Sequence, residues 1–128
     1  MTKLLLLMVG GAIGSAGRYF LSGFTHRLFE PTFPYGTLMV NLLGSAIIGF
    51  IWGLWESGNL STNVRSFVFI GLLGGFTTFS TFMLESMNLI RDGEYRLGLI
   101  NLLIHNVGGV VAVFAAFYLA RFLTQLLR

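Results

Sequence analysis

The sequence predicts an all-α membrane protein whose chain crosses the bilayer with four helices. Only 10% of its 128 residues are charged and 55% are hydrophobic, whereas soluble domains carry about 25% charged residues. Four long apolar stretches also lie between short polar segments, and a helix needs about 20 such residues to cross a hydrocarbon core of about 30 Å. These stretches use most of the chain, so we expect one membrane domain over residues 1–128.

The four spans are separated by segments rich in proline, glycine or charge. Both prolines lie in the first separating segment, 30–34. The second segment, 56–63, contains Ser61 and Thr62, either of which could cap the next helix. The third is the short charged turn 91–94. The predicted spans are approximately 4–24, 36–55, 67–90 and 97–120.

The N-terminus has some features of a secretory signal peptide. Lys3 precedes an apolar run that ends in the small residues of 15–17. Arg18 nevertheless continues directly into an apolar sequence, and three further spans follow. We therefore expect this segment to be the first membrane helix.

Composition excludes several other classes of protein. The chain contains no cysteine, which excludes a disulfide framework and a thiolate metal site. Its eight lysines and arginines are scattered singly, so we expect no nucleic-acid partner. The spans contain no aspartate, no HExxH motif and no paired carboxylates, so we expect no enzymatic activity.

The basic residues are divided equally between the two sides of the membrane. Four spans place the N-terminus, the second loop and the C-terminus on one side. That side carries Lys3, Arg65, Arg121 and Arg128, and the other carries Arg18, Arg27, Arg91 and Arg96. The positive-inside rule needs a bias to fix an orientation. Either eight charges are too few to judge, or the chain inserts in both orientations and forms an antiparallel pair.

Small residues recur at four-residue spacing in every span. They form three GxxxG pairs and one Gly/Ala series: Gly10 and Gly14, Gly49 and Gly53, Gly71 and Gly75, and Gly108, Ala112, Ala116 and Ala120. Such faces let helix backbones approach closely in lipid. We expect most of them to pack within the four-helix bundle. Because four helices make a thin wall, we also expect an oligomer.

The third span is predicted to be broken in the middle of the membrane. Its residues 74–81 place two glycines shortly before a run of hydroxyl side chains. Non-helical backbone at membrane depth is tolerated only inside protein or beside water, and it frees carbonyl oxygens that can bind a cation. The alternative is a continuous helix whose hydroxyls bond to carbonyls one turn earlier.

Several other polar residues lie within the spans. Asn41 follows Thr37 by one turn, and its alternative role is a simple hydrogen bond between helices. Asn101, His105 and Gly109 share one face of the fourth span. Glu85 lies beyond the expected break and could also be close to the membrane surface. Intramembrane polar residues usually face the bundle interior or a water path.

Three segments resemble the signature segments of the Fluc (CrcB) fluoride channels. They are residues 10–19, 36–44 and 74–82, and the last, with its Thr-Thr-Phe-Ser-Thr-Phe run, is the most specific. The resemblance covers the whole chain in length, number of spans and motif order. It implies a fluoride-specific channel in the bacterial inner membrane that passively releases cytoplasmic fluoride. It also implies an antiparallel, dual-topology homodimer with two pores and a central structural Na⁺ that is not transported.

The same resemblance implies roles for individual residues. Asn41, Phe79 and Phe82 correspond to the pore asparagine and pore phenylalanines of the family. Main-chain carbonyls of Gly74 and Thr77 from both subunits would surround Na⁺. Hydroxyl donors and one histidine would complete the fluoride path, and an arginine would have a vestibule or structural role; these residues are Thr37, Ser80, Thr81, His105 and Arg18. Gly109, at the third position of the family's polar track, has no side-chain donor.

Two alternative functions belong to other classes. A small dual-topology, proton-coupled multidrug exporter has similar dimensions, but it needs a deep carboxylate in the first span, which has none here. A structural membrane subunit would transport nothing. A purified protein that releases fluoride from liposomes would separate the channel from both.

Overall fold

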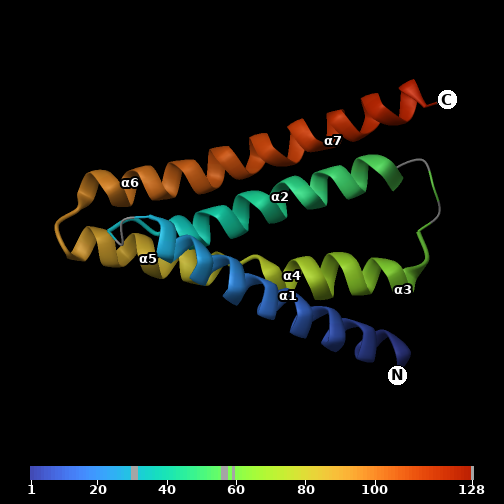
Figure 1. Cartoon of the computed structure of the whole chain (residues 1–128), viewed down its shortest axis with the longest axis horizontal. Helices are drawn as coiled ribbons and strands as arrows, with labels where there is room; N and C mark the ends of the chain where they lie inside the picture. The colour runs from blue at the N-terminus through green and yellow to red at the C-terminus, as the bar shows by residue number, and fades with distance from the viewer. Residues whose placement is uncertain (30–31, 56–57, 59, 128) are drawn as a thin grey trace.

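The chain folds into four long helical stretches that run back and forth along one axis. The computed structural model describes residues 1–29, 32–55, 58 and 60–127. Residues 30, 31, 56, 57, 59 and 128 lie outside the described part, including portions of two predicted linkers and the C-terminal arginine of the charge count. Both termini lie at the same end of the molecule (Figure 1).

The first two stretches are single helices. Helix α1 covers Thr2–Leu28, and helix α2 covers Tyr35–Trp55. Pro34 immediately precedes α2 and its carbonyl accepts from the Leu38 N–H at 3.2 Å. A proline suits this place because its fixed φ is compatible with the start of a helix and its missing N–H is not needed there.

The third stretch consists of several helical segments in series. It begins with α3, Thr62–Arg65, and Ser61 is its N-cap, with a side chain that accepts from Val64 N at 3.3 Å. Of the two predicted caps, Ser61 is therefore correct. The π-helical segment η1, Ser66–Leu73, and the short α4, Gly74–Phe76, follow. After residues 77 and 78 comes α5, Phe79–Arg91.

The fourth stretch returns alongside the others after a tight turn. Gly93 in this turn has φ +87°, a conformation that favours glycine. Helix α6 covers Tyr95–Leu103, the π-helical segment η2 covers Ile104–Gly108, and α7 covers Gly109–Leu126. Each of the four predicted spans lies within one of these helical stretches.

Glycines allow the helices to pack backbone against backbone. Helix α1 packs on η1 and α4, and α2 packs on α7. A Cβ at Gly75 would lie 2.6 Å from the Gly11 carbonyl oxygen, and one at Gly53 would lie 2.6 Å from the Phe117 carbonyl oxygen. The small residues thus serve packing within the bundle, as predicted.

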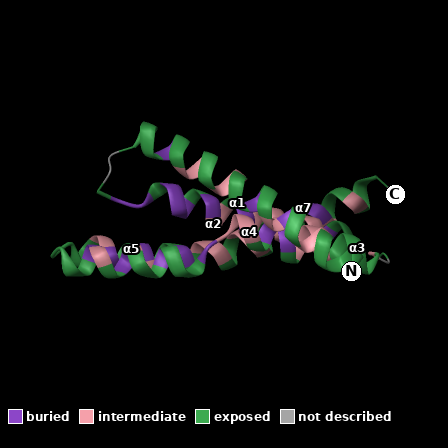
Figure 2. Ribbon diagram, turned by 90° about the horizontal axis from the view of Figure 1, so that it is seen from below, coloured by how far each residue is buried: buried purple, intermediate pink, exposed green. Residues whose placement is uncertain are grey.

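The outer surface of the bundle is apolar. Many large hydrophobic side chains are exposed along α1, α5 and the fourth stretch, and buried residues concentrate where α2 meets its neighbours (Figure 2). Each helical stretch is long and apolar enough to cross a membrane: Thr2–Leu28, Tyr35–Trp55, Thr62–Arg91 and Tyr95–Leu126. The predicted all-helical class, with four stretches long and apolar enough to span a membrane, is confirmed.

Candidate functional site

Two consecutive threonines with extended backbone separate α4 from α5. Thr77 has φ −83° and ψ 158°, and Thr78 has φ −148° and ψ 119°. The Thr77 N–H and hydroxyl both donate to the Leu73 carbonyl at 3.0 Å, which closes the preceding helical turn. The Thr78 hydroxyl accepts from Thr81 N at 3.3 Å and caps α5. Threonine suits both places because its hydroxyl competes well for backbone partners.

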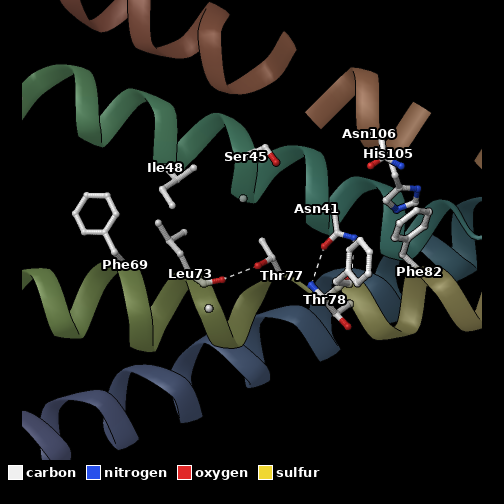
Figure 3. A pocket seen from close by; sticks show the side chains of 13 residues that line it. Asn41, Ser45, Ile48, Phe69, Leu73, Thr77, Thr78, Phe82, His105 and Asn106 are labelled. Carbon is white, nitrogen blue, oxygen red and sulfur yellow. Dashed lines mark hydrogen bonds between the residues drawn. The ribbon is translucent and has the colours of Figure 1, made fainter. Parts of the chain in front are cut away.

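The side chain of Asn41 holds this extended pair from α2. Its Nδ2 donates to the Thr78 carbonyl at 2.9 Å, and its Oδ1 accepts from Thr78 N at 2.8 Å (Figure 3). One amide therefore satisfies both backbone groups of a buried residue outside any helix. The hydrogen bond to another helical stretch that was the alternative role of Asn41 is therefore present. We name this pair of bonds the Asn41 clamp.

The capping bonds redirect two N–H groups away from main-chain carbonyls. In a continuous α-helix, Thr78 N–H would donate to the Gly74 carbonyl and Thr81 N–H to the Thr77 carbonyl. Here these donors bond to Asn41 Oδ1 and to the Thr78 hydroxyl. The Thr77 carbonyl accepts instead from Arg18 Nη1 at 3.2 Å. The extended pair thus removes the usual helical donors from the Gly74 and Thr77 carbonyls, the two to which the family resemblance assigned a role.

A pocket of about 430 Å³ lies beside the extended pair (Figure 3). Its lining comes from α2, the third stretch and η2, and it combines apolar side chains with amide, hydroxyl and imidazole groups. The lining residues are Asn41, Gly44, Ser45, Ile48, Phe69, Leu73, Gly74, Thr77, Thr78, Phe79, Phe82, His105 and Asn106. Six of the ten predicted site residues lie here together: Asn41, Gly74, Thr77, Phe79, Phe82 and His105.

Three aromatic rings follow one another along this pocket. Phe79 is 67% exposed, and its ring meets Phe82 edge to face at a centroid distance of 5.5 Å. Phe82 is only 2% exposed and stacks on the imidazole of His105 at 4.2 Å with an interplanar angle of 19°. The rings therefore lead from the surface of the chain to its buried interior.

The remaining predicted residues lie around a second pocket, apart from Ser80. This pocket, of about 550 Å³, is lined by Ser15, Arg18, Tyr19, Ser22, Gly23, His26, Thr37, Thr78, Thr81. Arg18, Thr37 and Thr81 are thus brought together, and Thr78 lines both pockets. Ser80 is exposed and is not among the lining residues of either pocket.

Two polar contacts were not predicted from the sequence. Glu85 is half-buried in the bundle, and its Oε1 accepts from Thr37 Oγ1 at 2.6 Å. Asn101 is fully buried, and its Nδ2 donates to Ser86 Oγ at 2.9 Å. The spacing of Asn101 and His105 indicated a shared face, but no local signal pointed to the partners on α5, because these depend on how the two stretches align.

Comparison with known proteins identifies the relatives of this chain. Residues 5–117 match the family described as "CrcB-like protein, Camphor Resistance (CrcB)". A protein of Parabacteroides distasonis named fluoride-specific ion channel FluC is 49% identical over 121 residues, which cover 94% of each chain. The FluC of Dehalococcoides mccartyi (strain CBDB1) is 41% identical over 127 residues, covering 98% of this chain and 97% of the relative. That of Salinibacter ruber is 44% identical over 113 residues, covering 88% and 85%.

These similarities extend through all four helical stretches and both pockets. By the names of these relatives, the family is one of ion channels and not of enzymes, and the three relatives named above come from bacteria. With four helices that are able to span a bilayer, this chain is a multi-pass bacterial membrane protein, and it belongs to the CrcB-like family.

Proposed function

We propose that the protein is a fluoride-specific channel that lets fluoride leave the cytoplasm passively through the inner membrane. The observation that carries this proposal is the 430 Å³ pocket in which the Asn41 clamp, the extended pair and the Phe82–His105 stack meet. The names of the relatives agree with fluoride as the permeant ion. Such a channel needs no ATP and makes no chemical change in the ion.

The chemistry of the pocket suits a small, strongly hydrated anion. Fluoride loses its water only where protein donors replace it. The Asn41 amide has two N–H groups, of which one is bonded to Thr78, so the other is available to an ion. Ser80 and Thr81 bring further hydroxyl groups to the path at its surface and second pocket. Thr37 also lines the second pocket, where its hydroxyl donates to Glu85.

Phe79 and Phe82 would contribute the positive edges of their rings to the path. An aromatic ring carries a negative face and a positive edge, so an edge attracts an anion weakly. The lining of the first pocket includes no lysine or arginine. Weak attraction by ring edges, without a cationic side chain in the lining, fits a channel, because a permeant ion has to bind and then leave.

We further propose that the working unit is an antiparallel homodimer in lipid. Phe79 is 67% exposed although it lines the pocket, and a second copy would cover it and complete the path. The equal division of basic residues between the two sides agrees with insertion in both orientations. The two extended pairs would then meet near the middle of the membrane.

The carbonyls of Gly74 and Thr77 fit a Na⁺ ion. Hard cations prefer oxygen ligands, and the normal helical donors to these two carbonyls are bonded elsewhere. The bond from Arg18 uses one of the two lone pairs of the Thr77 oxygen. When bound, Na⁺ would supply a fixed positive charge and join the two subunits.

A test of the sodium site compares the thermal unfolding of the detergent-solubilised dimer in Na⁺ with that in K⁺ and in N-methylglucamine. Because a ligand that binds only the folded state stabilises it, we expect the midpoint to rise with Na⁺ concentration and not with the other cations. Equal midpoints in all three salts would exclude a structural Na⁺.

Orientation is tested by labelling, because the chain contains no cysteine that would interfere. A single cysteine introduced at Gln125 should react with a membrane-impermeant maleimide from both sides of the membrane. Reaction from one side only would refute dual topology without affecting the proposed permeant ion.

The function itself is tested with purified protein in liposomes loaded with fluoride. We expect fluoride efflux when a potassium ionophore dissipates the membrane potential, and no dependence on an imposed pH gradient. Phe82→Ile should reduce the efflux while the dimer remains intact on gel filtration. Efflux no faster than from protein-free liposomes, with folded dimer present, would refute the proposal; transport driven by a pH gradient would instead favour an exporter.

A further inference from the structure

Asn101 is connected to Phe82 through its side chain. It is fully buried in α6, and its Nδ2 donates to Ser86 Oγ on α5 at 2.9 Å. The Ser86 hydroxyl in turn donates to the Phe82 carbonyl at 2.8 Å. Two hydrogen bonds thus join the Asn101 side chain on α6 to the main chain of Phe82, whose ring lines the pocket.

Asn101 is also connected to Phe82 through its own backbone. Its carbonyl lies 3.0 Å from His105 Nδ1, and the His105 ring stacks on Phe82 at 4.2 Å. A carbonyl oxygen only accepts, so the hydrogen of this bond is on Nδ1. The side-chain route and the backbone route close a ring of contacts that begins and ends at Phe82.

We propose that Asn101 is a positioning residue for the Phe82–His105 stack and is not itself part of the ion path. Its side chain has no exposed surface and is not among the lining residues of the pocket. Instead it fixes α6 against α5, so that both rings keep their orientation toward the pocket. This inference rests on the proposed function, in which fluoride passes the edge of Phe82.

The same contacts define what His105 offers to an ion. With hydrogen on Nδ1, the neutral imidazole carries a lone pair on Nε2, and this buried nitrogen has no hydrogen-bond partner among the described residues. A lone pair repels an anion. His105 therefore acts as the stacking partner of Phe82 and does not donate an N–H to fluoride.

The first test measures fluoride efflux from liposomes for Asn101→Ala, Ser86→Ala and the double variant. A buried donor or acceptor left without its partner is costly, so we expect each single variant to lower the flux by about tenfold. The double variant should be no slower than the singles, because all three break the same connection. Asn88→Ala, on the same helix as Ser86, is the control and should conduct normally.

A coupling measurement separates positioning from a general loss of structure. In a His105→Ala background the stack is absent and only the route through Ser86 to the Phe82 main chain remains, so Asn101→Ala should lower the flux by a smaller factor than it does in the wild type. The inference is wrong if Asn101→Ala protein of normal thermal stability retains flux within about twofold of the wild type. It is also wrong if Asn101→Ala lowers the flux by the same factor with and without His105.

A second readout does not depend on flux. The chain has two histidines, and His26→Gln leaves His105 as the only one. In ¹⁵N-histidine-labelled protein under alkaline conditions, we expect a protonated, pyrrole-type Nδ1 and a pyridine-type Nε2. Ser86→Ala should leave this tautomer unchanged, because the Asn101 carbonyl belongs to the main chain of the same helical stretch, but it should shift the ring resonances of His105 by altering its stacking on Phe82. Hydrogen on Nε2 in the parent protein, or unchanged His105 ring resonances in Ser86→Ala, would overturn the inference.

The two readouts also distinguish this inference from the proposed function. If the wild-type protein releases no fluoride, the proposed function fails, and the His105 ring resonances in Ser86→Ala alone decide whether the Asn101 side chain positions the ring. If the wild type conducts and the tautomer is as expected but Asn101→Ala conducts normally, only the positioning role fails.

Discussion

Removing the Asn41 clamp provides a direct test of how the extended pair is stabilised. In Asn41→Ala, the Thr78 N–H and carbonyl lose partners at 2.8 and 2.9 Å. Thr78 is 9% exposed, so water replaces these bonds poorly. A buried polar group without a partner costs about 1–3 kcal/mol, which gives about 2–6 kcal/mol for the two groups. We expect Asn41→Ala to lower the free energy of unfolding by an amount within this range.

The measurement is equilibrium unfolding in detergent micelles followed by circular dichroism, together with amide hydrogen exchange at Thr78. Exchange at Thr78 should accelerate strongly in Asn41→Ala. Ser45→Ala is the matched control, because Ser45 lies one turn further along α2 and lines the same pocket without taking part in the clamp. A loss below about 0.5 kcal/mol in Asn41→Ala, with unchanged exchange at Thr78, would refute the reasoning.

Four further substitutions test other positions by the same unfolding measurement. Gly14→Ala places a Cβ against the backbone of the third helical stretch and should lower the free energy of unfolding by about 1–3 kcal/mol. At Gly23 nothing lies within 4 Å, so Gly23→Ala should raise the free energy of unfolding by up to about 1 kcal/mol. Thr37→Val removes the donor to Glu85 and should cost about 1–3 kcal/mol; no loss would mean that the carboxyl finds another partner. Ser61→Ala deletes the cap of α3 and should cost about 0.5–2 kcal/mol, and equal stability of the variant would contradict the capping role.

Local patterns in the sequence were sufficient for the helices and for part of the site. Apolar length identifies a membrane span because the bilayer thickness imposes it. The glycine pair followed by two threonines pointed to residues 74–81, where Thr77 and Thr78 are extended. Asn41 was recognisable because an amide in a membrane helix needs a partner. The resemblance to the family added the roles of Phe79 and Phe82.

Contacts between helical stretches could not be predicted from the sequence. Whether Thr37 reaches Glu85, and whether Asn101 reaches Ser86, depends on the relative rotation and translation of helices that are joined by loops. Glu85 illustrates the difficulty, since its distance of six residues from Arg91 was equally consistent with the membrane surface. The π-helical segments η1 and η2 change the phase of side chains within a stretch, which helical spacing alone does not reveal.

The position of the termini determines how two copies can be joined in one polypeptide. Both termini lie at the same end of the molecule (Figure 1), because the number of spans is even. A flexible linker from the C-terminus of one copy to the N-terminus of the next therefore produces two parallel copies. An antiparallel pair in a single chain needs one additional crossing helix of about 20 apolar residues. A tandem fusion without such a helix would fix the two copies in parallel, and one with the helix would fix them in antiparallel orientation.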